Sequence, residues 1–114
     1  MIIAIDFDGT IVADKYPQIG VTQPYAADVI RTLHDAGHFI IIWTSRSGAH
    51  LLDAVNHLLE HGIPFDRVNA GNPHNERQYG SDTRKVYADM YIDDHNLGGF
   101  PGWLSVRETI IDCQ

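Results

Sequence analysis

Two aspartates near the amino terminus, Asp6 and Asp8, have the residue type and the spacing of chemically active groups. They follow Ile2–Ile5, an apolar run long enough for a buried strand, and Gly9 ends the pattern. Strand side chains two positions apart share a face, so both carboxylates would lie on one side of the strand's end. Two such acids repel each other unless a cation lies between them or one stays protonated, and both arrangements serve catalysis. The alternative is a polar exit from the strand, with Asp-Gly as a turn.

Two later apolar runs also end in polar residues. Phe39–Trp43 leads into Thr44, and Met90–Ile92 leads into Asp93 and Asp94. If all three runs are parallel strands of one sheet, their carboxyl ends lie along one edge, where open α/β sheets bind ligands. Four carboxylates and a hydroxyl at that edge are typical of a site for a hard cation and a phosphate group.

This order of residues resembles the haloacid-dehalogenase-like superfamily of phosphohydrolases. Four motifs carry the resemblance: Asp-Phe-Asp-Gly-Thr at 6–10, Thr44, Lys85 and Asp93-Asp94. They occur in the family's order over nearly the whole chain, with Arg84 as the alternative to Lys85 for the third. The runs at 16–20 and 91–96 are similar to a small capless bacterial branch of the superfamily.

The resemblance implies one Rossmann-like α/β domain over residues 1–114. It would have three layers, a mostly parallel sheet with helices on both faces, and no cap domain. The implied activity is Mg²⁺-dependent hydrolysis of phosphate monoesters through an aspartyl phosphate on Asp6, with Asp8 as general acid and then general base.

The resemblance also assigns roles to the other residues of the edge. The implied metal ligands are Asp6, Asp8 through its backbone carbonyl, Asp93 and Asp94. Thr44 and Lys85 are implied to bind the transferring phosphoryl oxygens. We expect further substrate contacts from Gly9, Ser45 and Arg46, although Arg46 could instead project into solvent.

Functions from other classes use similar residues. A phospho-accepting receiver domain also gathers acids, a hydroxyl and a lysine around Mg²⁺, but Asp8 stands where an acid/base for turnover belongs. A non-catalytic metal-binding module is a second alternative, and the full motif set argues against it. Among enzymes, Asp8 disfavours a dehalogenase, whereas a phosphotransferase or mutase stays open.

Apolar spacing predicts two long helices. The first would be capped by Thr22, carry Pro24 in its first turn and end at Gly37. The second would bury one stripe, made of Leu51, Leu52, Val55, Leu58 and Leu59. His57 and His61, one turn apart on this helix, have a spacing that zinc can use. The alternative is that they bind no metal, because they lie off the apolar stripe and the helix dipole favours a histidine such as His61 at the helix end.

The connections are predicted from turn formers. Residues 11–21, broken by Pro17 and Gly20, predict a hairpin or loop folded over the crevice. We expect a third strand at 66–70, a polar surface loop at 71–80, and one helical turn carrying Lys85, capped by Ser81 or Asp82. A capping box at 105–108 predicts a short closing helix, with an edge strand as the alternative.

Composition limits the partners. The chain has 114 residues and a formal charge of −7, and its eight Lys and Arg residues are scattered, so nucleic acid is an unlikely ligand. No apolar stretch is long enough to span a membrane. The single Cys113 favours a reducing compartment, and Met1 leads straight into the first strand, so we expect a cytoplasmic protein. Without a cap the crevice is open to a small or macromolecular phosphorylated substrate, unless a second subunit of a homo-oligomer covers it.

Overall fold

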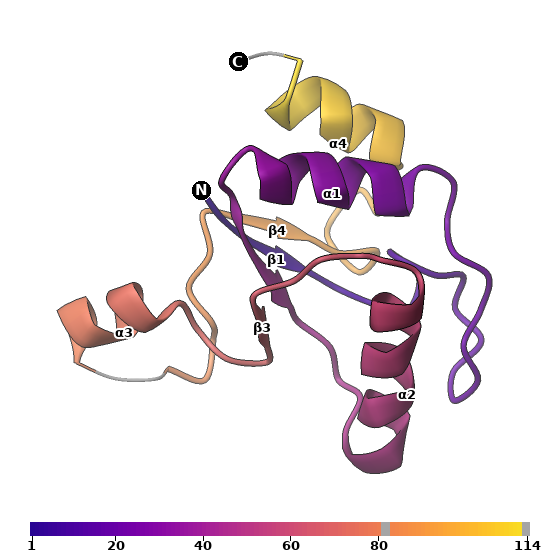
Figure 1. Ribbon diagram of the computed structural model, residues 1–114, viewed down its shortest axis with the longest axis horizontal. Helices are drawn as coiled ribbons and strands as arrows, with labels where there is room; N and C mark the ends of the chain where they lie inside the picture. Colours follow the sequence, from indigo (N-terminus) through magenta and orange to yellow (C-terminus); the bar gives the residue numbers. More distant parts are fainter. Residues whose placement is uncertain (81–82, 113–114) are drawn as a thin grey trace.

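The computed structural model describes residues 1–80 and 83–112 (Figure 1). In chain order its elements are β1 (Ile2–Ile5), α1 (Ala26–Asp35), β2 (Phe39–Ile42), α2 (Gly48–Glu60), β3 (Arg67–Val68), α3 (Pro73–Tyr79), β4 (Met90–Ile92) and α4 (Trp103–Ile110). The four strands form one sheet in the order β3-β2-β1-β4, and every neighbouring pair is parallel. This confirms the predicted Rossmann-like α/β fold.

The strand register brings the predicted site together. The chain runs outward from β1 to β2 and β3, then returns to the other side of β1 as β4, so the direction of winding changes at β1. Ile5 is level with Ile42 on one side and with Ile92 on the other. The next residues, including Asp6 and Asp93, therefore leave the sheet at the same edge, beside the point where such folds bind ligands.

The two faces of the sheet are covered differently. Side chains alternate along each strand, so Ile3, Ile5, Ile40 and Ile42 point to one face, where they pack with the apolar stripes of α1, α2 and α4. Figure 1 shows α1 and α4 side by side, and the two helices are in contact. This face contains most of the core.

The opposite face is covered by a segment without helical structure. Ala4 and Ile41 pack there against Val86 and Ala88. Helix α3 lies on this side as well, because its Tyr79 lines a cavity together with Val86 and Ala88. The sheet is thus the middle of three layers, and the layer on this side contributes fewer residues to the core.

The predicted start of the first helix was wrong. Helix α1 begins at Ala26, after Tyr25 in a left-handed conformation at φ 66°. Thr22 instead forms an antiparallel bridge with Val12, and its Oγ1 lies 3.0 Å from His57 Nε2. Pairing with a distant segment overrode the local capping preference of Thr22.

The stripe predicted for the second helix was too wide. Leu58 is fully buried, but Leu59 is 64% exposed and Leu52 is 59% exposed. Successive helical residues are about 100° apart, so a residue directly after a buried one lies at the flank of the stripe. Helix α2 contacts the core through Ala54 and Leu58, with Leu59 beyond the contact.

Residues 71–80, predicted as a loop, contain helix α3. The Asn72 side chain accepts a hydrogen bond from the Asn75 backbone N–H at 3.0 Å, Pro73 opens the helix, and Gly80 ends it at φ 80°. These capping signals were present in the sequence. The loop prediction rested on the polar and turn-forming residues of this segment, which in the structure begin and end a helix that buries no residue.

Three smaller predictions also changed. The third strand is limited to Arg67–Val68. The proposed caps Ser81 and Asp82 lie outside the described residues, and 83–89 is not helical, so Lys85 is not on a helical turn. The closing helix is confirmed, but it begins at Trp103, which places the proposed capping box of 105–108 inside the helix.

Within the described ranges, no helix has the length and apolar character needed to cross a membrane.

Candidate active site

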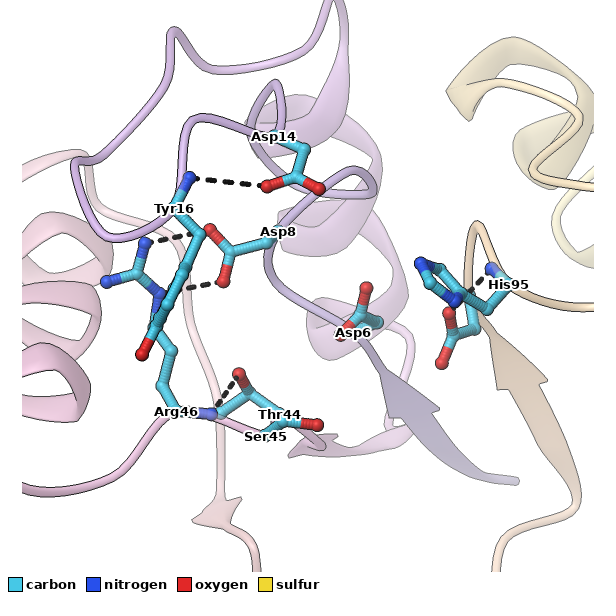
Figure 2. Close-up of a pocket in the computed structure, with 9 residues that line it drawn as sticks. Asp6, Asp8, Asp14, Tyr16, Thr44, Ser45, Arg46 and His95 are labelled. Atoms are coloured by element: carbon cyan, nitrogen blue, oxygen red, sulfur yellow. Dashed lines mark hydrogen bonds and ion pairs between the residues drawn. The ribbon is translucent and has the colours of Figure 1, made fainter.

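A cavity of about 610 Å³ opens at the carboxyl ends of the strands (Figure 2). The residues that line it are Asp6, Asp8, Asp14, Tyr16, Thr44, Ser45, Arg46, Asp93 and His95. It therefore contains most of the residues that the sequence singled out. Lys85 is not among them.

Three carboxylates converge at one end of this cavity. Oxygens of Asp6, Asp93 and Asp94 lie within 4.8 Å of one another. The Asp6 backbone N–H donates to the Ile92 carbonyl at 2.9 Å, which fixes the end of β1 against the end of β4. The strand pairing that builds the sheet thus also holds the acids together. The Asp8 side chain lies outside this cluster.

The electrostatics of this cluster favour a cation. Burial, the negative charge of Asp93 and a hydrogen bond with Asp94 raise the pKa of Asp6 from 3.8 to about 8. Asp94 Oδ1 is buried and has no hydrogen-bond partner among the described residues. A buried acceptor without a donor is costly, and a divalent metal ion would remove both this cost and the repulsion. All-oxygen donors of this kind suit Mg²⁺.

Gly9 makes room for this arrangement. Its φ is +85°, and a Cβ at this position would collide with the Asp94 carboxylate. The Gly9 N–H donates to the Val12 carbonyl at 2.8 Å, so it is already engaged within the loop. Gly9 was predicted to bind substrate, but its place in the structure is explained by the turn and by the close approach of Asp94.

Asp8 faces away from the acidic cluster and pairs with Arg46. Arg46 Nε donates to Asp8 Oδ2 at 2.7 Å, and Nη2 donates to Asp8 Oδ1 at 2.8 Å. The remaining guanidinium N–H groups donate to the carbonyls of Pro17, Gln18 and His50. All five donors of Arg46 are therefore used inside the protein. This corrects both readings of the sequence: Arg46 lines the cavity, but its donors are not available to substrate, and it does not project into solvent.

Thr44 and Ser45 line the cavity as predicted, and Asn69 orients Thr44. The Thr44 N–H donates to Asn69 Oδ1 at 2.8 Å, and Asn69 Nδ2 donates to the Thr44 carbonyl at 2.9 Å. The Thr44 hydroxyl accepts the Arg46 backbone N–H at 3.1 Å. Since that oxygen already accepts a hydrogen bond, its own proton can be directed at a ligand.

Lys85 occupies a different place from the one predicted. It is exposed, its amino nitrogen lies 5.3 Å from the centre of the Tyr91 ring, and it lines a second cavity with Tyr79. Its neighbour Val86 is buried against the opposite face of the sheet, and the Val86 carbonyl accepts a hydrogen bond from the Tyr91 hydroxyl at 2.6 Å. These contacts hold the segment on that face. The alternative cation, Arg84, is also exposed and does not line the cavity of Asp6.

A comparison with solved structures finds a relative that is similar over the whole of this chain. The structure of a conserved protein coded by a locus from Bacteroides thetaiotaomicron has 38% sequence identity to this chain and a TM-score of 0.89. The match covers 100% of this chain and 92% of that chain. The chain belongs to the same family as this Bacteroides protein. No protein-family model matches the sequence, and no curated protein matches it either.

Sequence reasoning did not assign a role to several residues of the site. Thr10 Oγ1 donates to Asp6 Oδ2 at 3.3 Å and accepts the Asp94 N–H at 3.1 Å, so it links the two strand ends. His95 lines the cavity directly after the two acids, with its ring 84% exposed. Two features of the sequence could have indicated these residues: Thr10 ends the first motif, and His95 directly follows Asp94.

The loop at 11–21 lies at the cavity, as the sequence predicted. Its residues Asp14 and Tyr16 line the cavity wall, and the Tyr16 N–H donates to Asp14 Oδ1 at 3.3 Å.

The histidine pair of α2 was considered as a zinc site. The His57 and His61 rings stack on each other with centroids 3.9 Å apart. Among the residues described here, the only group of three suitable metal ligands is the aspartate cluster, so the histidine pair lacks a third ligand.

Proposed function

We propose that the protein is a Mg²⁺-dependent phosphatase of the haloacid-dehalogenase-like superfamily, which hydrolyses phosphate monoesters through a phosphorylated Asp6. The observation that carries the proposal is the convergence of three carboxylates at the carboxyl ends of β1 and β4, beside a cavity that also presents Asp8 and Thr44. A purely structural role would not explain why these charges gather at one end of the sheet.

The fit of a metal ion supports the proposal. Asp6, Asp93 and Asp94 would hold Mg²⁺, because their oxygens are close together and Asp94 Oδ1 has no donor within the described residues. When bound, Mg²⁺ would offset the negative charge that otherwise keeps a phosphate away from the Asp6 carboxylate.

In the first chemical step, a carboxylate oxygen of Asp6 attacks phosphorus, and the bond from phosphorus to the ester oxygen breaks. Asp8 gives a proton to the departing oxygen, so the alcohol leaves neutral. In the second step, Asp8 takes a proton from a water molecule as the water oxygen attacks phosphorus. The bond between Asp6 and phosphorus then breaks, and inorganic phosphate leaves with both carboxyl groups restored.

The remaining groups of the cavity would hold the phosphate. The Thr44 hydroxyl has its proton available, and Ser45 lies next to it on the cavity wall. Hydrogen bonds from fixed donors to the transferring oxygens stabilise the charge that develops in the transition state. Asn69 fixes this wall through its two hydrogen bonds to the Thr44 backbone.

The test is release of inorganic phosphate from a broad panel of phosphate esters, with and without Mg²⁺. We expect Mg²⁺-dependent turnover by the wild type, and a loss of about 10³-fold or more in Asp6→Asn, which removes the nucleophile. Asp35→Asn is the matched control, because it removes an exposed carboxylate at the end of α1. Circular dichroism would check that both variants fold.

Two outcomes would contradict the proposal. Full activity in Asp6→Asn would exclude the covalent mechanism. Accumulation of a stable phosphorylated Asp6 without phosphate release would instead favour a phospho-accepting regulatory domain.

A further inference from the structure

Arg46 connects three parts of the chain around the cavity. It pairs with Asp8 at the end of β1, donates to the His50 carbonyl in the first turn of α2, and donates to the carbonyls of Pro17 and Gln18 in the 11–21 loop. The Arg46 guanidinium carbon also lies 5.0 Å from the centre of the Tyr16 ring. One side chain thus contacts the proposed acid/base and the loop that forms the cavity wall.

The burial of Arg46 makes this connection specific. Its side chain is 1% exposed, and its Asp8 partner is 17% exposed. A buried guanidinium is tolerated only when its charge and its donors are matched, and here every N–H group has an acceptor. Because the planar guanidinium group has fixed directions, the positions of Asp8 and of the loop carbonyls depend on each other.

The pair with Arg46 leaves part of the Asp8 carboxylate uncommitted. A carboxylate has four lone-pair sites on its two oxygens, and Arg46 uses one on each oxygen. The other sites remain for contact with the leaving group of a substrate. Figure 2 shows Asp8, Arg46 and Tyr16 together on one side of the site, with Asp6 on the other.

We propose that Arg46 is a positioning residue that fixes Asp8 as general acid at the leaving-group side of the cavity and anchors the 11–21 loop in the same arrangement. This inference rests on the proposed phosphatase function. Without Arg46, the Asp8 carboxylate could turn to other orientations, and the loop would lose its two anchored carbonyls. Protonation of the leaving group would then become slow, while attack by Asp6 would be affected less.

The first test compares two substrates. 4-Nitrophenyl phosphate has a leaving group that needs little protonation, whereas glycerol 2-phosphate releases an alkoxide that needs a proton. We expect Arg46→Gln to lower kcat on glycerol 2-phosphate by about 10²-fold or more, and on 4-nitrophenyl phosphate by at least about tenfold less. Arg46→Lys should recover part of the loss. Arg107→Gln, which removes the guanidinium of an exposed pair with Asp112, is the matched control.

Equal losses on the two substrates would show that Arg46 has a structural role only, and unchanged rates would likewise overturn the proposal. If Arg46→Gln does not fold, Arg46→Lys provides the same comparison of substrates. The double variant Asp8→Asn/Arg46→Gln, which leaves no unpaired carboxylate, then serves for the comparison of loop stability.

The second test needs no activity. Lys15 is exposed in the loop, so trypsin can cut before Tyr16 when the loop opens. We expect release of the fragment 1–15, followed by mass spectrometry, to be about tenfold faster in Arg46→Gln and in Asp8→Asn than in Arg107→Gln. Equal cleavage rates would refute the link between Asp8 and the loop. If the wild type hydrolyses no ester, the proposed function fails, and the cleavage rates still decide whether Arg46 couples Asp8 to the loop.

Discussion

The acidic cluster should bind Mg²⁺ more tightly as the pH rises from 6 to 8. In the metal-free protein the pKa of Asp6 is raised from 3.8 to about 8, chiefly by burial and then by the charge of Asp93. Below pH 8 the cluster therefore holds a proton that has to leave before all three carboxylates can bind a cation. Raising the pH removes this competitor, so the apparent affinity should rise and then level off above pH 8.

The size of the effect follows from the competition between one proton and one metal ion. With a pKa of about 8, the proton weakens the apparent affinity about 100-fold at pH 6 and about twofold at pH 8, so the expected gain is about 50-fold. The same proton affects folding. Between pH 4 and 8 Asp6 binds more protons in the native metal-free protein than in the unfolded chain, so the contribution of Asp6 to the free energy of unfolding should fall as the pH rises.

Isothermal titration calorimetry with Mg²⁺ at pH 6, 7 and 8 measures the affinity directly. Repeating it in two buffers with different enthalpies of ionisation counts the protons released. Asp6→Asn is the control: it should bind Mg²⁺ more weakly, with little dependence on pH. An affinity that is constant between pH 6 and 8, with no proton released by the wild type, would show that the metal-free cluster is already ionised and would refute this reasoning.

Two further predictions concern stability, both measured by urea unfolding. Leu58→Ala should lower the free energy of unfolding by about 2–5 kcal/mol because it leaves a cavity in the core. Leu59→Ala, at a 64% exposed position, should change the free energy of unfolding by no more than about 0.5 kcal/mol. Equal effects of the two substitutions would contradict the placement of α2. Trp103→Phe removes the buried indole N–H that donates to the Thr10 carbonyl at 2.9 Å, so we expect a loss of about 1–3 kcal/mol. An unchanged unfolding midpoint in Trp103→Phe would mean that the carbonyl finds another donor.

The sheet and the acidic edge could be predicted because they depend on local patterns. Short apolar runs such as Ile2–Ile5 and Met90–Ile92 predict buried parallel strands, and both runs are strands in the structure. Once the strands are parallel, the acids that follow them must meet at one edge. The order of residues therefore predicts that Asp6, Asp93 and Asp94 lie at one edge, whereas the pairing of β1 with β4, which brings their carboxylates together, is seen only in the structure.

The contacts of single side chains could not be predicted in the same way. Arg46 appeared to be either a substrate contact or a solvated residue, because its acceptors Pro17, Gln18 and Asp8 are distant in sequence. Leu59 has the same residue type as the buried Leu58, and only the packing of α2 distinguishes them. Such features depend on long-range geometry, which neither spacing nor composition contains.

The position of Lys85 changes how the proposed site would balance charge. A phosphate that enters the cavity meets the carboxylates of Asp6 and Asp93, while the positive charge of Arg46 is already paired with Asp8. Of the cavity-lining side chains, His95 is the other one that can carry a positive charge, and its ring is mostly in solvent, where its attraction is weak. Under the proposed function, Mg²⁺ therefore supplies most of the charge that holds the phosphate, with Thr44 and Ser45 contributing hydrogen bonds. This explains in physical terms why turnover is expected to require the metal.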